Sequence, residues 1–389
     1  MDSIVYSDGI FTVNKSGKTM ESDCKMITHY KNAEEQLRRS HEWKTATEHV
    51  FAENYMISRP ERVFEPRVNG IASVCGDYFY YSLELEKGGG VYKKSKTDPV
   101  DEAFIFTSSD IVPQHLHADG SRLVCSLKYN DGTSHVAMFV AERPDYYEFT
   151  GGESVDEHPF IYKGMVFFDS AGVRRDNNGG SFIGNRGISV YDIENKAVSE
   201  LFYSEEYEYI LPKIDANGDL YCIRRPRQKE SSVGGMLMGI ITAPFWIFAA
   251  IVGFLSAFVR IFAGKQLVEK NNTRSAKESA KEIIDGCEID IEREEKRNAK
   301  QGEKYPGYAP RDWELIKIKD ISGVIASKSE IYAMKNAEKI CSGVIAYEVL
   351  ENGRVVISNG NCVVLRDGRK AELITKKLAV NRNFTVTNV

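Results

Sequence analysis

The sequence predicts an all-β fold: a six-bladed β-propeller with a mainly helical, partly apolar insertion inside one blade. Three observations indicate this fold class. Five short strand–turn–strand hairpins recur along the 389 residues, the first four turn glycines lie 44, 44 and 54 residues apart, and the long gap before the fifth contains an apolar segment. These turn glycines are Gly76, Gly120, Gly164, Gly218 and Gly353.

Each hairpin supplies two of the four strands that a blade needs. The hairpins are ASVCGDYFYYS (72–82), LHADGSRLVCS (116–126), IYKGMVFFDS (161–170), KIDANGDLYCI (213–223) and EVLENGRVVIS (348–358). A second unit of strand, polar turn and strand follows most of them, as in GISVYDIENKAVSELFY and CVVLRDGRKAELIT. Four strands in a repeat of about 40 to 50 residues are typical of a propeller blade, which buries both faces against its neighbours.

The two ends of the chain are expected to complete a sixth blade. SIVYSDGIFTVNKSGK (3–18) and AVNRNFTVTNV (379–389) read as strands, and pairing them closes the ring and removes its open edge. The propeller then comprises 1–228 and 313–389, with a seventh blade possible if 313–330 is a degenerate repeat. The gap between Gly218 and Gly353 is 135 residues, and removing the 84 residues 229–312 leaves 51, which is again one repeat.

Some of these repeats resemble those of a known group. HLHADGSRLVCSL followed by HVAMFVAERPD, and GISVYDIENKAVSEL, are similar to the repeats of TolB-like propellers, with a strand–DG–strand hairpin and a following hydrophobic–Tyr–Asp strand. The resemblance covers the β portion and implies the fold alone, because propellers serve many functions. The usual periplasmic setting of that group requires a signal peptide, and MDSIVYSDG does not read as one.

The insertion contains a stretch of membrane length. Residues 233–259 carry no charge over 27 positions, and a membrane-spanning helix needs about 20. A single crossing would place strands of one propeller on opposite sides of the bilayer, and 265–312 is too charged to cross back. We therefore expect a re-entrant hairpin turning near Pro244, or a helix lying in the interface.

The residues expected to contact lipid all lie in this apolar segment, 233–262. They are Leu237, Ile240, Ile241, Phe245, Trp246, Phe248, Ile251, Phe254, Leu255 and Phe258. Basic residues on both flanks are expected to face lipid head groups on the cytoplasmic side, namely Arg224, Arg225, Arg227, Lys229, Arg260 and Lys265. The alternative is burial of the apolar segment in protein, in a homo-oligomer or in a larger assembly.

Two further segments read as helical. An excursion over 30–57 is rich in Ala, Glu and Arg, and either one long helix or two short ones fit it. An amphipathic charged helix is predicted over 273–302, before a linker at 303–312. The narrow apolar stripe of this helix is expected to face the ring, the apolar segment or a protein partner. It consists of Ala276, Ala280, Ile283, Ile284, Cys287 and Ile291.

Candidate chemistry is sparse. His115, His117 and His158 begin two successive blades, where strands line the central channel, and strand alternation would put His115 and His117 on one face. They are minor candidates for a metal site, and no metal, cofactor or catalytic residue is otherwise predicted. The sequence has no CxxC, GxSxG or HExxH motif, and Cys75, Cys125, Cys222 and Cys362 read as buried free thiols in apolar strands.

The net charge of the chain argues against nucleic acid as a partner. The net charge of −5 provides no general attraction for nucleic acid. Taken together, the repeats and the apolar insertion predict a propeller scaffold for protein partners, attached monotopically to the cytoplasmic side of a membrane. The alternative is a soluble propeller whose apolar helix drives homo-oligomerisation or docking, and a third, less favoured interpretation is an enzyme that uses the central channel.

Overall fold

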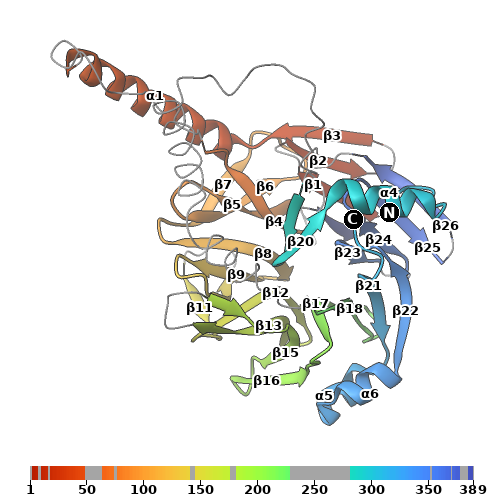
Figure 1. The fold of residues 1–389 in the computed structure, drawn as a ribbon. Helices are drawn as coiled ribbons and strands as arrows, with labels where there is room; N and C mark the ends of the chain where they lie inside the picture. Colours follow the sequence, from red (N-terminus) through yellow and green to blue (C-terminus); the bar gives the residue numbers. More distant parts are fainter. Residues whose placement is uncertain are drawn as a thin grey trace, which may run out of the picture.

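The computed structural model describes residues 2–7, 10–15, 18–48, 64–73, 77–140, 145–175, 181–227, 281–350, 353–368, 370–376 and 384–388. Within these ranges the strands form six blades around a common axis (Figure 1). The chain is therefore a six-bladed β-propeller, as its repeats predict.

The first three blades hold the N-terminal half and the C-terminal strand. Blade 1 contains β27 (Phe384–Asn388), β1 (Asp2–Ser7), β2 (Ile10–Lys15) and β3 (Lys18–Asp23). Blade 2 contains β4 (Arg67–Ser73), β5 (Tyr78–Glu84), β6 (Gly89–Ser95) and β7 (Glu102–Ser108). Blade 3 contains β8 (Ile111–Asp119), β9 (Arg122–Tyr129), β10 (Ser134–Val140) and β11 (Tyr146–Glu148).

The other three blades complete the ring. Blade 4 contains β12 (Ser154–Tyr162), β13 (Met165–Arg175), β15 (Gly187–Asp192) and β16 (Ala197–Phe202), with the short β14 (Ser181–Ile183) on β13. Blade 5 contains β17 (Tyr207–Ile214), β18 (Leu220–Pro226), β21 (Glu314–Ile318) and β22 (Ala337–Ser342). Blade 6 contains β23 (Ala346–Val349), β24 (Val355–Ser358), β25 (Val363–Asp367) and β26 (Lys370–Thr375).

One blade holds strands from both ends of the chain. β27 lies antiparallel to β1, with Thr387 opposite Ser3 and Thr385 opposite Val5. The innermost strands β27, β4, β8, β12, β17 and β23 each contact the next, and β23 contacts β27. A parallel bridge from Ser134 to Val155 also joins blades 3 and 4. Residues 313–330 lie in blade 5, so they add no seventh blade.

Packing between blades explains the long apolar runs in the strands. Five consecutive residues of β5, Phe79 to Leu83, are buried. A strand with one face in water would alternate buried and exposed residues, whereas a strand between two packed layers is buried on both faces. The stability of each blade therefore depends on its neighbours, as expected for a repeat architecture.

The described part of the insertion corrects the helix predicted over 273–302. Residues 281–290 form a hairpin of β19 (Lys281–Ile284) and β20 (Cys287–Asp290), and α4 (Ile291–Lys300) begins only afterwards. Asp285 and Gly286 have φ of 45° and 81°, and Asp-Gly at a two-residue turn is a strong hairpin signal. The Asp290 side chain then caps α4 by accepting a hydrogen bond from the Arg293 amide at 3.0 Å.

This hairpin is packed into the ring, so most of the described residues of the predicted stripe face the ring, one of the expected alternatives, and not a protein partner. Ile284 and Cys287 are buried in one cluster with Trp313, Ile291 packs against it, and Ile283 alone is 48% exposed. Asn298 of α4 is buried and donates to the carbonyls of Gly307 and Ala309 at 2.6 and 3.0 Å. Ala276 and Ala280 lie outside the described residues.

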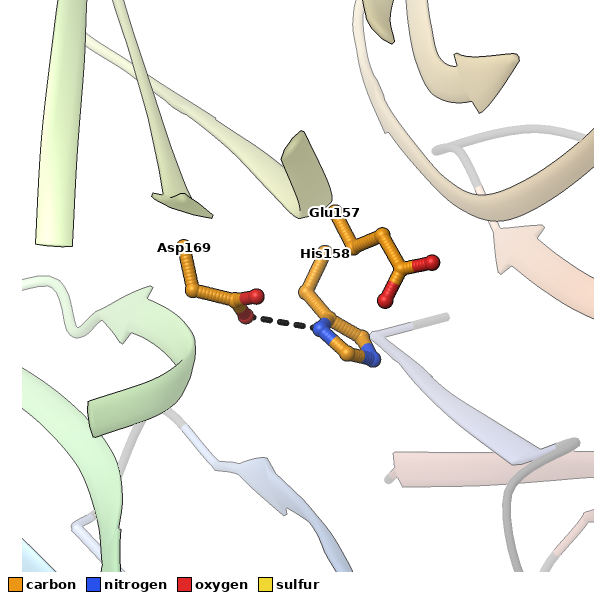
Figure 2. A group of neighbouring side chains, drawn as sticks. All are labelled: Glu157, His158 and Asp169. Atoms are coloured by element: carbon orange, nitrogen blue, oxygen red, sulfur yellow. Dashed lines mark hydrogen bonds and ion pairs between the residues drawn. The ribbon is translucent and has the colours of Figure 1, made fainter. Parts of the chain in front are cut away.

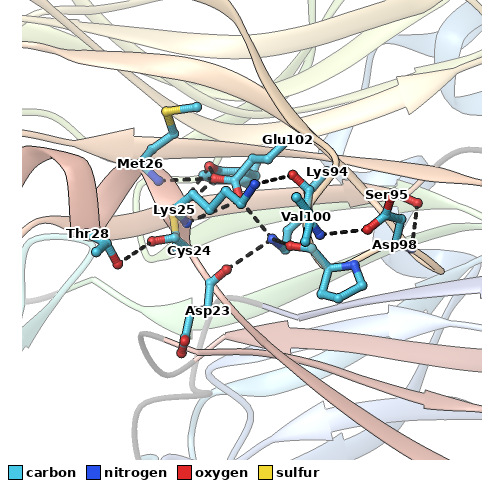
Figure 3. Close-up of polar contacts among 12 residues, drawn as sticks. Asp23, Cys24, Lys25, Met26, Thr28, Lys94, Ser95, Asp98, Val100 and Glu102 are labelled. Atoms are coloured by element: carbon cyan, nitrogen blue, oxygen red, sulfur yellow. Dashed lines mark hydrogen bonds and ion pairs between the residues drawn. The ribbon is translucent and has the colours of Figure 1, made fainter.

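The described part of the N-terminal excursion is one helix, α1 (Lys25–Glu48), which extends away from the ring (Figure 1). Its first turn is held by Glu102 of β7, whose carboxylate accepts from the amides of Lys25 and Met26 at 3.2 and 3.3 Å (Figure 3). Lys94 Nζ lies 2.7 Å from that carboxylate and 3.0 Å from the Asp23 carbonyl, and both charged side chains are fully buried. A buried ion pair thus attaches α1 to blade 2.

Two short helices interrupt blade 5 between β21 and β22. They are α5 (Ile321–Ser327) and α6 (Glu330–Lys335), which contact β16 of blade 4. Asp320 and Ser329 cap their first turns by accepting from the amides of Gly323 and Tyr332. The pair therefore covers the outer edge of blade 4 next to blade 5.

Candidate functional site

The innermost strand of every blade contributes to a cavity of about 230 Å³ on the propeller axis. One lining residue from each blade, in ring order, is Thr385, Asn69, His115, His158, Lys213 and Glu348. Strands of six blades that converge on one axis place polar groups far apart in the sequence within reach of one ligand. This axial cavity is the candidate functional site.

Four of the six inner strands carry a β-bulge along the axial cavity. The register shifts between Val68 and Gly70, Gln114 and His117, Glu157 and Phe160, and Ile210 and Lys213. In three of them a residue other than glycine is left-handed: φ is 52° at His115, 54° at His158 and 54° at Leu211. Such φ values are uncommon for these residues and cluster at functional sites.

These bulges correct the expectation that His115 and His117 share a strand face. The bulge lies between them and breaks the two-residue alternation. The His115 ring lies 3.9 Å, centroid to centroid, from that of His158. His117 instead packs on Phe160, and its Nδ1 accepts the Ile161 amide at 3.1 Å. Burial, with a smaller effect from Lys213, lowers the pKa of His117 to about 3, so this ring is neutral at ordinary pH.

A buried carboxylate, Asp169 of β13, orients His158 (Figure 2). Asp169 Oδ2 lies 2.7 Å from His158 Nδ1 and accepts the Leu211 amide at 2.9 Å. Its other oxygen accepts from Arg186 at 2.6 Å, and Arg186 also reaches Glu157 at 2.7 Å. The network joins blades 4 and 5 at the bulge of β17, because the Leu211 amide belongs to that bulge.

The charges in this network stabilise one another. Burial disfavours the ionised form of Asp169, but the charges of His158 and Arg186 outweigh it and hold the pKa of Asp169 below its usual value. Burial likewise opposes a charged His158, and the charge and hydrogen bond of Asp169 outweigh it, so the pKa of His158 is raised. Glu157 and Asp285 act on His158 in the same direction.

The arrangement of Glu157, His158 and Asp169 does not fit a metal site. Their ligand atoms lie within 4.8 Å of one another. However, the distance of 2.7 Å between His158 Nδ1 and Asp169 Oδ2 is that of a charge-assisted hydrogen bond, and Arg186 already donates a hydrogen bond to each of the two carboxylates. A dication here would face a buried guanidinium. The geometry instead matches a structural ion-pair network that fixes the His158 ring.

A second ion pair lines the cavity from blades 5 and 6. Lys213 Nζ lies 2.6 Å from Glu348 Oε1, and the neighbouring Tyr347 hydroxyl donates to the Leu211 carbonyl at 2.5 Å. Burial raises the pKa of Glu348, and Lys213 opposes that effect. Because the charges that line the cavity occur in pairs, the site is suited to binding a neutral or dipolar group.

The described cysteines are free and buried, as the strand pattern predicts for Cys125, Cys222 and Cys362. Burial raises the pKa of Cys24, Cys287 and Cys341 to about 11, and the same cause raises that of Cys125, Cys222 and Cys362. A protonated, buried thiol is a poor nucleophile. Cys75 lies outside the described residues.

Two residues expected to face head groups face protein instead. Arg225 is 1% exposed: it pairs with Glu208 at 2.6 Å, donates to the Asp285 carbonyl at 2.7 Å and lies over the Trp313 ring. Arg224 pairs with Glu314 across the strands at 2.6 Å. Strand alternation points the two side chains to opposite faces of blade 5: the docked hairpin covers Arg225, and Glu314 of β21 pairs with the half-buried Arg224, whereas Arg227 is exposed.

The remaining lipid-facing candidates lie outside the described residues. They are Lys229, Leu237, Ile240, Ile241, Phe245, Trp246, Phe248, Ile251, Phe254, Leu255, Phe258, Arg260 and Lys265. Among the helices of the described ranges, none is long and apolar enough to cross a membrane.

The sequence interpretation did not single out Asp169, Arg186, Glu157, Lys213 or Glu348. One local signal was available for Asp169, which follows Val166, Phe167 and Phe168 in an apolar strand. A carboxylate inside such a run requires a buried partner. Its partners come from β12, β17 and the residues before β15, so no sequence spacing connects them.

The six blades and the axial cavity define a β-propeller. Several solved structures are similar to this chain. TolB from Acinetobacter baumannii aligns with 94% of this chain and 59% of its own, at 10% identity and a TM-score of 0.45. A putative TolB from Agrobacterium tumefaciens aligns over 84% and 92% of the two chains, at 12% identity and a TM-score of 0.36. YCF48 bound to a D1 peptide aligns over 98% and 80%, at 8% identity and a TM-score of 0.38.

The resemblance to TolB is one of fold. The chain spans 59% of the length of the Acinetobacter TolB structure. The sequence matches no protein-family model and no curated protein.

The paired His158 provides a test of the network by pH. The pKa of His158 is raised in the folded protein, so its charged form adds stability below the ordinary pKa of about 6.5, and this contribution is lost as pH rises through the folded pKa. We therefore expect His158→Gln to destabilise the fold more at pH 6 than at pH 9, measured by urea unfolding.

The control is His117→Gln, because burial lowers the pKa of His117 from 6.5 to about 3 in the folded protein, so only the unfolded chain takes up this proton near pH 6. His117→Gln should therefore destabilise the fold less at pH 6 than at pH 9, which is the opposite pH dependence to that of His158→Gln. An equal or larger effect of His158→Gln at pH 9 would contradict the charged His158–Asp169 pair.

Proposed function

We propose that this chain is a scaffold propeller that binds protein partners and is held on the cytoplasmic side of a membrane by residues 228–280. The observation that carries the proposal is the register of blade 5. β18 and β21 are hydrogen-bonded neighbours, and Arg224 lies opposite Glu314 at the end where the chain leaves the blade. The insertion therefore begins and ends at the same end of the same blade.

The returning half of the insertion supports this interpretation. The hairpin and α4 are packed into the ring, and Arg225 holds the hairpin turn through the carbonyls of Ile284 and Asp285. The apolar segment is thus attached to the ring at Arg227 and again at Lys281. A segment with both ends on one body enters and leaves the lipid on one side, as a re-entrant hairpin or an interfacial helix does.

The axial cavity favours binding over catalysis. Within the described residues its lining charges are paired, His158 with Asp169 and Lys213 with Glu348, and no cysteine lines it. A catalytic acid, base or nucleophile requires a group free to exchange a proton with a substrate. A rigid ring with surface loops suits recognition of other proteins.

Removing residues 233–262 tests membrane attachment. We expect the full chain to float with vesicles of neutral and anionic phospholipid in a density gradient, and the deletion variant to remain in the soluble fraction. The physical reason is the loss of an uncharged apolar segment whose transfer to lipid is favourable by several kcal/mol, at about 0.3–0.6 kcal/mol per large apolar residue.

A matched pair of triple variants distinguishes membrane binding by this segment from non-specific binding of vesicles by exposed apolar residues elsewhere. Serine at Leu237, Ile240 and Ile241 should weaken flotation, and serine at the exposed Val100, Phe104 and Ile331 should not. Flotation of the deletion variant would refute membrane attachment by this segment. A full chain that stays soluble as a discrete oligomer, and becomes monomeric on deletion, would establish the assembly role instead.

A further inference from the structure

A second cavity of about 230 Å³ lies between blades 4 and 5, away from the axis. The β12–β13 turn, the β17–β18 turn and α5 enclose it. Its apolar wall consists of Met165, Phe167, Ile321 and Ile325. The ordered turns and the packed helix hold these walls in place, so the cavity belongs to the folded ring.

One buried polar atom at this cavity has no hydrogen-bond partner among the residues that the structure describes: the Tyr162 hydroxyl. Gly218 faces it, since a β-carbon added at Gly218 would lie 3.3 Å from the hydroxyl oxygen. Gly218 has a φ of 85°, which favours glycine, and a side chain at this position would crowd the hydroxyl. A buried hydroxyl without a partner is unfavourable, and a ligand that supplies one gains that free energy.

The charges at the cavity mouth balance. Lys163 Nζ lies 4.9 Å above the Tyr162 ring, and Asp320 lies on the opposite turn. Both Asp320 oxygens are used: one accepts from the Gly323 amide at 3.1 Å and the other from the Tyr332 hydroxyl at 2.7 Å. The site therefore offers an apolar wall and one hydrogen bond, with no net charge to select an ion.

We propose that this cavity binds one large aliphatic side chain of a protein partner, with the adjacent peptide carbonyl accepting a hydrogen bond from Tyr162. Its volume accommodates one such side chain and excludes nucleotides or extended cofactors. This inference rests on the proposed scaffold function and names the class of partner contact. It does not depend on the membrane segment.

The test uses N-acetyl-leucinamide as the probe and the full chain, observed by ligand NMR with saturation transfer. N-acetyl-leucinamide should bind, and N-acetyl-glutamic acid amide and N-acetyl-lysinamide should bind less. Tyr162→Phe should weaken N-acetyl-leucinamide binding by roughly 3- to 10-fold, the value of one hydrogen bond. Its thermal stability should equal or exceed that of the wild type, because the lost hydroxyl has no partner in the free protein.

A second variant tests whether the probe binds in this cavity. Ser322 lines the mouth and is exposed, so Ser322→Phe should block the probe. Ala326→Phe, also exposed on α5 but outside the lining, is the matched control and should leave binding unchanged.

Each contrary result overturns the proposal. These results are equal binding by Tyr162→Phe, a destabilised Tyr162→Phe, preference for a charged probe, or no effect of Ser322→Phe. They are independent of vesicle flotation, so the cavity and the membrane attachment can fail separately.

Discussion

Replacing Asp169 by alanine is expected to lower the free energy of unfolding by about 3–5 kcal/mol. The side chain is fully buried and serves three partners: His158, Arg186 and the Leu211 amide. Without it the Arg186 charge faces Glu157 alone, and a backbone amide in the bulge of β17 loses its acceptor. Urea denaturation of the variant and the wild type at pH 7 measures the difference.

Asp110→Ala is the control for this experiment. Asp110 is exposed on the turn between β7 and β8, and changes at such positions alter stability by no more than about 0.5 kcal/mol. If Asp169→Ala lay within about 1 kcal/mol of the wild type, the network would not hold blades 4 and 5 together.

Replacing Lys94 by methionine is expected to cost a similar amount, about 3–5 kcal/mol. Lys94 and Glu102 are both fully buried, and removal of the cation leaves the Glu102 carboxylate without its charged partner. Because Glu102 also caps α1, the loss should reach the helix, so that amide exchange of Lys25 and Met26 becomes faster. Denaturation and hydrogen exchange measure the two effects.

The double variant Lys94→Met, Glu102→Gln separates a charge effect from lost packing. It should be more stable than Lys94→Met alone, because no uncompensated charge is then buried. Lys87→Met, at an exposed position, should change stability little. A double variant as unstable as the single one would show that the Lys94 stem, and not its charge, matters.

Local patterns were sufficient for the architecture. Turn glycines such as Gly120, Gly164 and Gly218 have positive φ and lie in the hairpins between the first two strands of their blades. Their spacing gives the length of one repeat, and the count of six follows from five hairpins and the two chain ends that complete the last blade. The predicted helix over 273–302 was wrong at 281–290. There the helical spacing of apolar residues was given priority over the Asp285-Gly286 turn signal, which forms a hairpin.

The axial site could not be read from the sequence. His115 and His158 were noticed as candidates, but their rings meet beside register bulges in β8 and β12, two strands of different blades, and no local pattern predicts those bulges. Arg225 looks like a flanking basic residue in the sequence and is buried against Trp313 and the returning hairpin in the fold.

The sequence by itself determined the features that repeat along the chain: strand period, turn residues and blade number. These depend on neighbours within a few residues, where backbone sterics and side-chain alternation act. The tertiary structure alone decided which charges meet. Asp169, Arg186, His158 and the Leu211 amide converge from separate strands, because closing the ring brings together groups whose separation along the chain has no relation to their distance in space.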